Sequence, residues 1–405
     1  MHPLPIEIIE LVIDFCAAYP TSFGNAEELH EDRRETLRAC ALTCKTWLPR
    51  SRFNLFRHVE ISPEHSSGIL LDTLRTNPHC ASNVRVLEVL DPLFSSGFVL
   101  LAERLPRLEW LHLYCKDAHR NNFFFMSMTQ FSSITFLTLS LPWSATHIMR
   151  LLACFPHLTY LNCGPDFCKA PISHPVSHYK PTFSLACIVL NLVSSVDFSS
   201  DDGPKPFYLY SILPRLAPAV FSCLRVCVLI LPDIRSAALK TNDWLLPLLA
   251  VAGPSIHELD LDFWSIEENP VAANDSSIFI SLRHNMNLRR LCVRLKESNA
   301  INILDLYELL STVVSTALVH IDICITSLTR SANEDVDHTF WQALDNLLKQ
   351  RRFRSLHTFN IVCNDHDRRI LEKTLSSVKL NMNRILTICG PFEPPVRRWT
   401  RLHGH

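Results

Sequence analysis

A six-residue pattern of apolar positions recurs along most of the chain. Positions 1, 4 and 6 of each window are apolar, and the windows begin at Phe56, Val84, Leu108, Ile134, Leu158, Val193, Leu224, Ile256, Leu288, Leu318 and Leu356. Successive windows start 24 to 38 residues apart. One window means little in a chain that is 47% hydrophobic, but the regular spacing indicates an internal repeat, with a short strand in each window.

The segments before the windows have helical periodicity, as in residues 69–75, 148–154 and 340–348. One helix and one short strand cannot bury an apolar face alone, whereas stacked units share a core and align their strands in a parallel sheet. The chain therefore resembles the leucine-rich-repeat superfamily, although many periods exceed about 29 residues and no asparagine recurs after the strand. We expect an α/β chain in which residues 56–390 form an irregular solenoid, with the sheet on its concave face and helices on its convex face. A βα domain of Rossmann type is the alternative.

The first sixty residues have a different pattern. Leu4-Pro5 begins a predicted amphipathic helix, and residues 21–35 have the polar composition of a loop. A second predicted helix has one apolar stripe formed by Leu37, Cys40, Ala41, Cys44 and Trp47. A third short element, residues 51–56, leads into the first window.

Residues 4–9, 37–47 and 55–59 together resemble a fungal-type F-box, which would occupy residues 1–55. The resemblance implies docking onto the adaptor subunit of SCF-type cullin–RING ubiquitin ligases, with the trailing domain holding a protein substrate. It implies that the adaptor contacts, or their direct supports, are Leu4, Pro5, Ile8, Ile9, Leu42 and Trp47. The polar insertion between the first two helices departs from compact family members. In the alternative, the same apolar residues only cap the first repeat.

Positions 3, 5 and 7 of each window should lie on the solvent-exposed face of the sheet, opposite the helices. In the windows from Leu108, Ile134 and Leu158 these positions predict a substrate-binding surface, formed by Trp110, His112, Tyr114, Phe136, Tyr160 and Asn162. Aromatic side chains are frequent anchors of protein interfaces. A register shift of one residue would instead place the same side chains in the core.

The windows from Ile256 and Leu288 carry opposite charges at these positions. The first has Glu258, Asp260 and Asp262, and the second has Arg290 and Arg294. If the two strands are parallel neighbours, Glu258 lies beside Arg290 and Asp262 beside Arg294, about 5 Å apart at the backbone. His320 and Asp322 should continue the rows on the following strand. Glu258, Asp260, Asp262, Arg290 and Arg294 are also candidate substrate contacts. They form either a structural charge ladder within the sheet or an acidic patch that binds a partner.

Composition argues against several classes of enzyme. Only eight glycines occur, and the closest pair, Gly390 and Gly404, is fourteen residues apart. A Walker A loop, a dinucleotide fingerprint and a nucleophile elbow all need glycines much closer together. We therefore expect no catalytic site, although an enzyme with scattered catalytic residues stays as an alternative.

Metal and nucleic-acid chemistry receive little support. Cys163, Cys168, His174 and His178 are zinc-ligand types, but only five residues separate the two pairs, so we expect a loop and no metal. The fifteen cysteines are odd in number and fall largely in apolar runs, which is typical of reduced core thiols. A net charge of −1 gives no overall attraction to nucleic acid.

The sequence as a whole predicts a substrate-recognition subunit with no cofactor. Its expected partners are the adaptor and an unidentified protein substrate, and not nucleic acid or a membrane. We find no signal peptide at the N-terminus and no uninterrupted apolar stretch long enough to cross a bilayer. We therefore expect a monomer in the cytoplasm or nucleus, with residues 391–405 as a tail. A scaffold built on the same solenoid, whose F-box-like module does not dock, is the first alternative.

Overall fold

The structure is a computed structural model of the 405-residue chain. It describes residues 5–17, 26–61, 67–90, 96–114, 125, 127–140, 145–164, 183–191, 218–232, 245–264, 280–295, 301–325, 334–363, 368–369, 372 and 386–389. These residues form two compact units. The N-terminal unit contains the described residues up to 140 and residues 147–158, and the C-terminal unit contains residues 145–146 and those from 159 onward. The boundaries predicted near residues 55 and 390 stay predictions.

Three helices begin the N-terminal unit: α1 (Ile6–Ala17), α2 (Ala26–Thr43) and α3 (Leu48–Arg57). Their shared core contains Ile13 and Leu37, each 1% exposed. The predicted loop over residues 21–35 is wrong from Ala26 onward, because the acidic and basic residues there form the first half of α2. Glu, Arg, Ala and Leu are strong helix formers, and their propensity outweighs the polar composition that indicated a loop. The predicted second helix also ends earlier, since Cys44 and Trp47 lie in the turn before α3.

The N-terminal unit continues with four parallel strands, β1 (His58–Ile61), β2 (Val86–Val89), β3 (Trp110–Tyr114) and β4 (Phe136–Ser140). Between or after them come α4 (Ser67–Thr76), α5 (Pro78–Ala81), α6 (Ser96–Arg104) and α8 (Ala145–Ala153). All four strands lie within or directly after the predicted windows. In the windows from Val84, Leu108 and Ile134, positions 1, 4 and 6 are buried as expected, and Leu108, Leu111 and Leu113 are each 0% exposed. In the window from Phe56 only position 6 of these three, Ile61, is buried. Burying one such side chain contributes about 1.5–3 kcal/mol.

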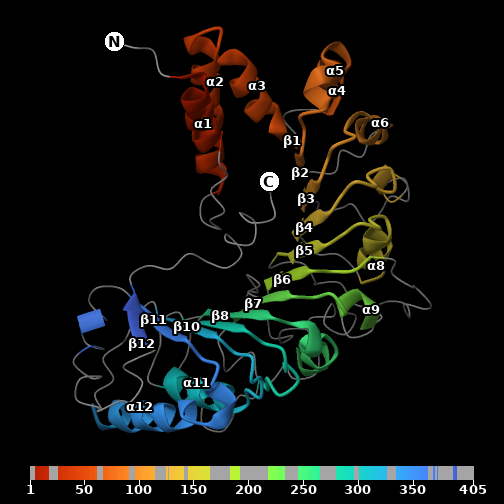
Figure 1. Cartoon of the computed structure of the whole chain (residues 1–405). Coiled ribbons are helices and arrows are strands. Elements are labelled where there is room, and N and C mark those ends of the chain that lie inside the picture. The colour runs from red at the N-terminus through yellow and green to blue at the C-terminus, as the bar shows by residue number, and fades with distance from the viewer. Residues whose placement is uncertain are drawn as a thin grey trace, which may run out of the picture. The chain divides into compact units, whose positions relative to one another are not determined.

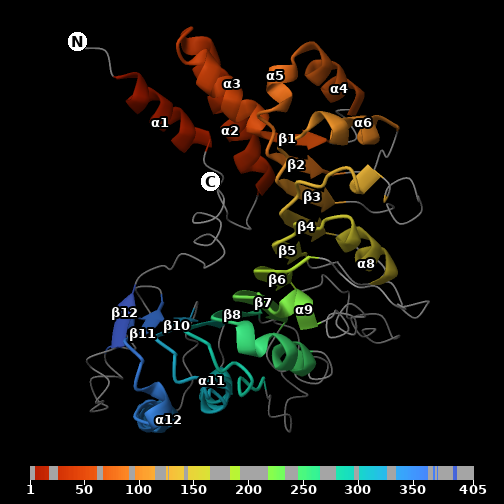
Figure 2. The ribbon, with the colours of Figure 1, turned by 45° about the vertical axis from the view of Figure 1, so that its right-hand side comes forward.

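The C-terminal unit contains eight parallel strands in sequence order (Figure 1). They are β5 (Tyr160–Cys163), β6 (Cys187–Asn191), β7 (Val226–Pro232), β8 (Glu258–Trp264), β9 (Arg290–Leu295), β10 (His320–Ile325), β11 (Thr358–Val362) and β12 (Leu386–Cys389). The helices include α9 (Pro218–Phe221), α11 (Ile301–Ser311) and α12 (Glu334–Leu348), and residues 245–252 are also helical. The short 3-10 turns are η4 (Gly253–Ser255) and η6 (Arg351–Phe353). Helices α11 and α12 lie side by side on one face of strands β9–β11 (Figure 2). The predicted parallel βα architecture is confirmed at this level.

The sixth strand departs from the predicted pattern. Strand β6 covers Cys187–Asn191, whereas the predicted window began at Val193 and lies outside the described residues. Leu185, Ile188 and Leu190 occupy positions 1, 4 and 6 of the window that β6 contains, and all three are 0% exposed. Its other positions are apolar too, which hid the alternation in the sequence.

A recurrent backbone contact fixes the stagger of neighbouring repeats. The residue before a strand accepts hydrogen bonds from two consecutive amides of the next repeat. His257 accepts from Arg289 and Arg290 at 2.8 and 3.0 Å, and Arg289 accepts from Val319 and His320 at 2.8 and 3.1 Å. Because each amide pair belongs to the start of the next strand, the contact keeps equivalent window positions side by side along the sheet.

Candidate protein-binding surfaces

The helical module exposes a stripe of apolar side chains on α1. Ile8, Leu11, Val12 and Phe15 follow the spacing i, i+3, i+4 and i+7, so they share one face of the helix. All four are exposed, and Phe15 is 81% exposed. Because Ile13 alone among the α1 side chains is fully buried, most of the apolar surface of this helix does not serve the module's own core.

The predicted adaptor contacts are spread over this module. Pro5, Ile8 and Leu42 are exposed, with Leu42 at 87%, whereas Ile9 and Trp47 are half-buried. Leu4 lies outside the described residues. Leu11, Val12 and Phe15 were not among the predicted contacts. Their signal was present, because α1 is apolar on nearly all sides and such a helix has to be covered by something.

A charged cluster fixes α1 against α3. Arg50 binds both carboxylate oxygens of Asp14, with Nε at 2.6 Å from Oδ1, and Asn54 Nδ2 donates to the same Oδ1 at 2.9 Å. These hydrogen bonds hold the pKa of Asp14 below its ordinary value, chiefly through Arg50. Paired guanidinium–carboxylate contacts are directional, so they set the orientation of the exposed stripe relative to α3.

The aromatic surface predicted on the sheet is present in part. In the N-terminal unit, the Trp110 ring packs edge-on against Phe136 at 4.9 Å and against His112 at 5.6 Å between ring centroids. These three side chains and Tyr114 are half-buried. Burial raises the pKa of Tyr114 to about 12, with a further contribution from Glu88.

Tyr160 does not belong to an exposed surface. It lies in the C-terminal unit and is 3% exposed, so the expectation that it faces solvent is wrong. Its neighbour in register on β6 is Cys187, also buried, and burial raises the pKa of the Tyr160 hydroxyl. Asn162, two residues further along β5, is half-buried.

The register predicted for the charged strands is confirmed. Glu258 lies opposite Arg290, Asp262 opposite Arg294, and Arg290 opposite His320. Strands β8, β9 and β10 are therefore adjacent and parallel, as the charge pattern indicated.

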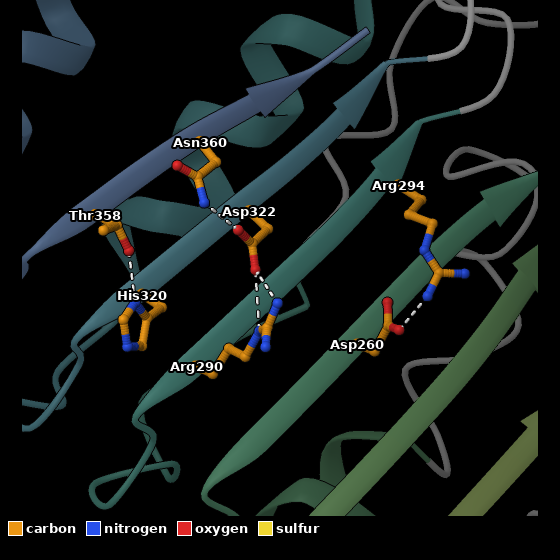
Figure 3. A network of polar contacts seen from close by, with 7 residues as sticks. All are labelled: Asp260, Arg290, Arg294, His320, Asp322, Thr358 and Asn360. Carbon is orange, nitrogen blue, oxygen red and sulfur yellow. Dashed lines mark hydrogen bonds and ion pairs between the residues drawn. The ribbon is translucent and has the colours of Figure 1, made fainter. Parts of the chain in front are cut away.

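The ion pairs on these strands run straight across, from Arg294 to Asp262, and also diagonally, as Figure 3 shows for Arg290–Asp322 and Arg294–Asp260. Arg290 contacts Asp322, which lies on β10 two residues beyond the residue opposite Arg290 in register. Its Nη2 and Nε atoms are 2.6 and 3.0 Å from Oδ2 of Asp322. Asn360 Nδ2 donates to the other oxygen of Asp322 at 2.7 Å. Arg294 joins two carboxylates, since Nη1 lies 2.8 Å from Asp262 and Nη2 contacts Asp260. The charge pattern did not predict the contact between Arg294 and Asp260, because Asp260 lies opposite Cys292 in register.

This face of the C-terminal unit is buried rather than open. Asp260, Asp262 and Asp322 are 2%, 6% and 2% exposed, which corrects the expectation that positions 3, 5 and 7 face solvent here. On β7 the corresponding side chains, Val226 and Val228, are buried as well. Glu258, Arg290 and Arg294 are half-buried, so the charged groups are only partly accessible.

Burial determines the ionisation of this cluster. Burial raises the pKa of Asp260 to about 6; Arg294 opposes the rise and the neighbouring Asp262 adds to it. For Arg294, burial disfavours the charge, but Asp260 and Asp262 outweigh it and hold the guanidinium pKa above its ordinary value. The cluster therefore combines a firmly charged guanidinium with a carboxyl that titrates near neutral pH.

Of the four zinc-ligand types in the sequence, one lies within the described residues. Cys163 is buried on β5, while Cys168, His174 and His178 lie outside the described residues. Within the described ranges no group of three or more His, Cys, Asp or Glu side chains is arranged to hold a metal ion. The cysteines described there are free thiols.

A scan of protein families and a search of curated proteins both find no match to this chain. No helix in the described part of the chain has the length and apolar character needed to cross a membrane.

Proposed function

We propose that this chain is a substrate-recognition subunit of an SCF-type ubiquitin ligase. In this proposal the helical module docks on the adaptor subunit, and the parallel sheet with its flanking repeats holds a protein substrate. One observation carries the first half: Ile8, Leu11, Val12 and Phe15 form an exposed apolar stripe on a module whose own core is already filled by Ile13 and Leu37.

The exposed apolar side chains of the helical module suit burial against a protein partner. A large apolar side chain that becomes fully buried in an interface gains about 1.5–3 kcal/mol. Phe15 on α1 and Leu42 on α2 are the most exposed large apolar side chains of the helical module, at 81% and 87%. They therefore have the most apolar area to bury on binding. Central, desolvated anchors of this kind carry most of the energy of many interfaces.

The test is direct binding of the full chain to purified adaptor subunit by calorimetry. We expect micromolar or tighter binding, an at least tenfold loss in Leu42→Ala and in Phe15→Ala, and a loss in the Leu4→Ala/Pro5→Ala double variant. Ile69→Ala is the matched control, because Ile69 is an exposed apolar residue of α4, 63% exposed, outside the module. Absence of wild-type binding at micromolar concentration contradicts the ligase proposal.

A scaffold function is the second candidate, and one contact favours it. Arg34 of α2 donates to Glu60 of β1 at 2.9 Å, so the helical module is tied to the first strand. Such a contact is what a cap on the end of a repeat array needs. If the module only caps the sheet, Arg34→Ala will lower the stability of the N-terminal unit and the adaptor will not bind.

A further inference from the structure

The Asp260–Asp262 pair on β8 carries more negative charge than its surroundings neutralise. Both carboxylates bind one guanidinium, that of Arg294, through their Oδ2 atoms. The Oδ1 atom of each is buried without a hydrogen-bond donor at normal distance in the part of the chain that the structure describes, although the Cys292 thiol helps to lower the pKa of the Asp260 carboxyl. With both groups ionised, the three side chains have a net charge of −1.

The neighbouring strands do not supply the missing cation within the described ranges. On β7, the residues opposite Asp260 and Asp262 are Val228 and Ile230, both apolar and buried. On β9, Cys292 lies opposite Asp260. Arg290, the next cation on this face, is bound to Asp322 by two hydrogen bonds, and it makes only the smallest contribution to lowering the pKa of Asp260.

A buried carboxylate with an unsatisfied oxygen is costly, so the charge has to be met by a proton, a polar molecule or an external cation. The surroundings of this pair fit one kind of cation well. Val228 and Ile230 offer apolar surface beside the two carboxylates. A long basic side chain needs that combination, because its aliphatic stem packs on apolar groups while its charged end reaches a carboxylate.

The existing contact indicates which basic group fits. Arg294 already spans Asp260 and Asp262 with its two terminal nitrogens, so the spacing of the carboxylates matches a guanidinium. A planar, forked donor can bind two acceptors at once, whereas an ammonium acts as a compact point charge.

We propose that Asp260 and Asp262 bind an arginine side chain of the protein substrate, with its stem against Val228 and Ile230. The inference rests on the proposed function only in taking the ligand to be part of a bound protein. Because Asp260 and Asp262 are 2% and 6% exposed, entry requires a local opening of the surrounding side chains. The population of the opened state lowers the apparent affinity for a small probe.

The probe for this site is N-acetyl-arginine amide, titrated into the full chain at pH 7.5 and followed by ligand-observed NMR. We expect saturable binding with a Kd on the order of millimolar, about the affinity of one desolvated charged group. N-acetyl-citrulline amide, which has the same shape without the charge, should not bind. Asp262→Asn should weaken binding at least tenfold, and Asp72→Asn, a change at an exposed aspartate of α4, should leave it unchanged.

Several results would overturn the proposal. Absence of saturable binding to the wild type would mean that a proton or another group neutralises the pair. Equal binding by wild type and Asp262→Asn would place the probe elsewhere, and equal affinity for N-acetyl-lysine amide would contradict the guanidinium assignment. If Asp262→Asn does not fold, as judged by circular dichroism, Asp260→Asn provides the same test.

The adaptor is absent from this assay, so the two proposals fail separately. Arginine binding without adaptor binding refutes the ligase function and leaves the site. Adaptor binding without arginine binding refutes the site and leaves the ligase function.

Discussion

Asp260 offers a quantitative test of how the buried charge cluster contributes to stability. Its carboxyl has a pKa of about 6 in the folded chain, against an ordinary value of 3.8. The main cause is burial, partly opposed by Arg294 and reinforced by Asp262, with smaller lowering contributions from Cys292 and Arg290. The folded state therefore prefers the protonated carboxyl more strongly than the unfolded state does.

The sign follows from which state binds more protons. Because the folded pKa is raised, the stability linked to Asp260 is fully present below pH 3.8 and is lost as pH rises through about 6. A difference of about two pKa units corresponds to about 3 kcal/mol of folding free energy. Above about pH 7 the penalty for the buried charge is constant.

Replacing Asp260 by Asn removes this titration and keeps the shape of the side chain. We expect the free energy of unfolding of Asp260→Asn, relative to wild type, to rise by up to about 3 kcal/mol between pH 4 and pH 7.5. Arg294 keeps Asp262 as a partner in the variant, at 2.8 Å. Comparing variant with wild type cancels the titration of groups such as Asp14, which acts in the opposite direction.

The assay is urea denaturation at half-unit steps from pH 4 to pH 8, with hydrogen exchange of the β8–β10 amides to assign the change to the C-terminal unit. Asp72→Asn, at an exposed position, controls for loss of a carboxylate and should show a flat difference from wild type. A flat difference for Asp260→Asn as well would refute the reasoning, since it would mean that Asp260 is charged at no cost. A difference that falls with rising pH would show that Arg294 more than compensates the burial, so that the folded pKa of Asp260 lies below 3.8.

Three further changes test the packing and the charge network. Leu261→Ala, at a 0% exposed position of β8, should destabilise the C-terminal unit by about 2–5 kcal/mol in urea denaturation, because it leaves a cavity; an unchanged midpoint would contradict the assigned register. Gly253→Ala should cost about 1–3 kcal/mol by the same measurement, since the added Cβ would lie 2.8 Å from the carbonyl oxygen of His284; a neutral effect would show that η4 shifts easily. Arg50→Gln should destabilise the helical module above pH 4 and lose its effect as pH falls below 3.8, because the arginine lowers the pKa of Asp14; an effect independent of pH in thermal unfolding would argue against the ion pair.

The period of apolar positions was sufficient to predict most of the sheet. Windows such as those from Leu108, Ile134 and Ile256 alternate clearly, because their other positions hold charged, polar or aromatic residues. The register between β8 and β9 was also predictable, since opposite charges at equivalent window positions favour only that pairing. Strand β6 was misplaced because all its residues but the last are apolar, so period alone could not position the window.

The properties that depend on tertiary surroundings were not predictable from pattern. A single strand does not show whether its outer face is covered, so the burial of Asp260 and Tyr160 had no sequence signal. The diagonal contact from Arg290 to Asp322 depends on the length and rotamer of the arginine side chain, and strand register alone does not determine either. At the N-terminus, the sequence indicated a helix that is apolar on nearly all sides, but which of these side chains are exposed became known only when the structure placed Ile13 in the core.

The position of the charge cluster also explains how strands β8–β10 can keep one register. A shift of β9 by one residue would place Leu291 where Arg290 stands, and the carboxylates of β8 would then face apolar side chains. Apolar contacts alone would penalise such a shift weakly, because both faces of these strands are largely buried. The neighbouring strand β7 is mostly apolar on both faces, so an apolar side chain is accepted on either one. Ion pairs in a buried setting add little net stability relative to apolar packing, but breaking one by misalignment costs several kcal/mol, on the order of 3–5. The ion pairs of Arg290 and Arg294 therefore favour the observed alignment over its one-residue shifts. The same alignment leaves the Oδ1 atoms of Asp260 and Asp262 as the acceptors to which we propose that a ligand binds.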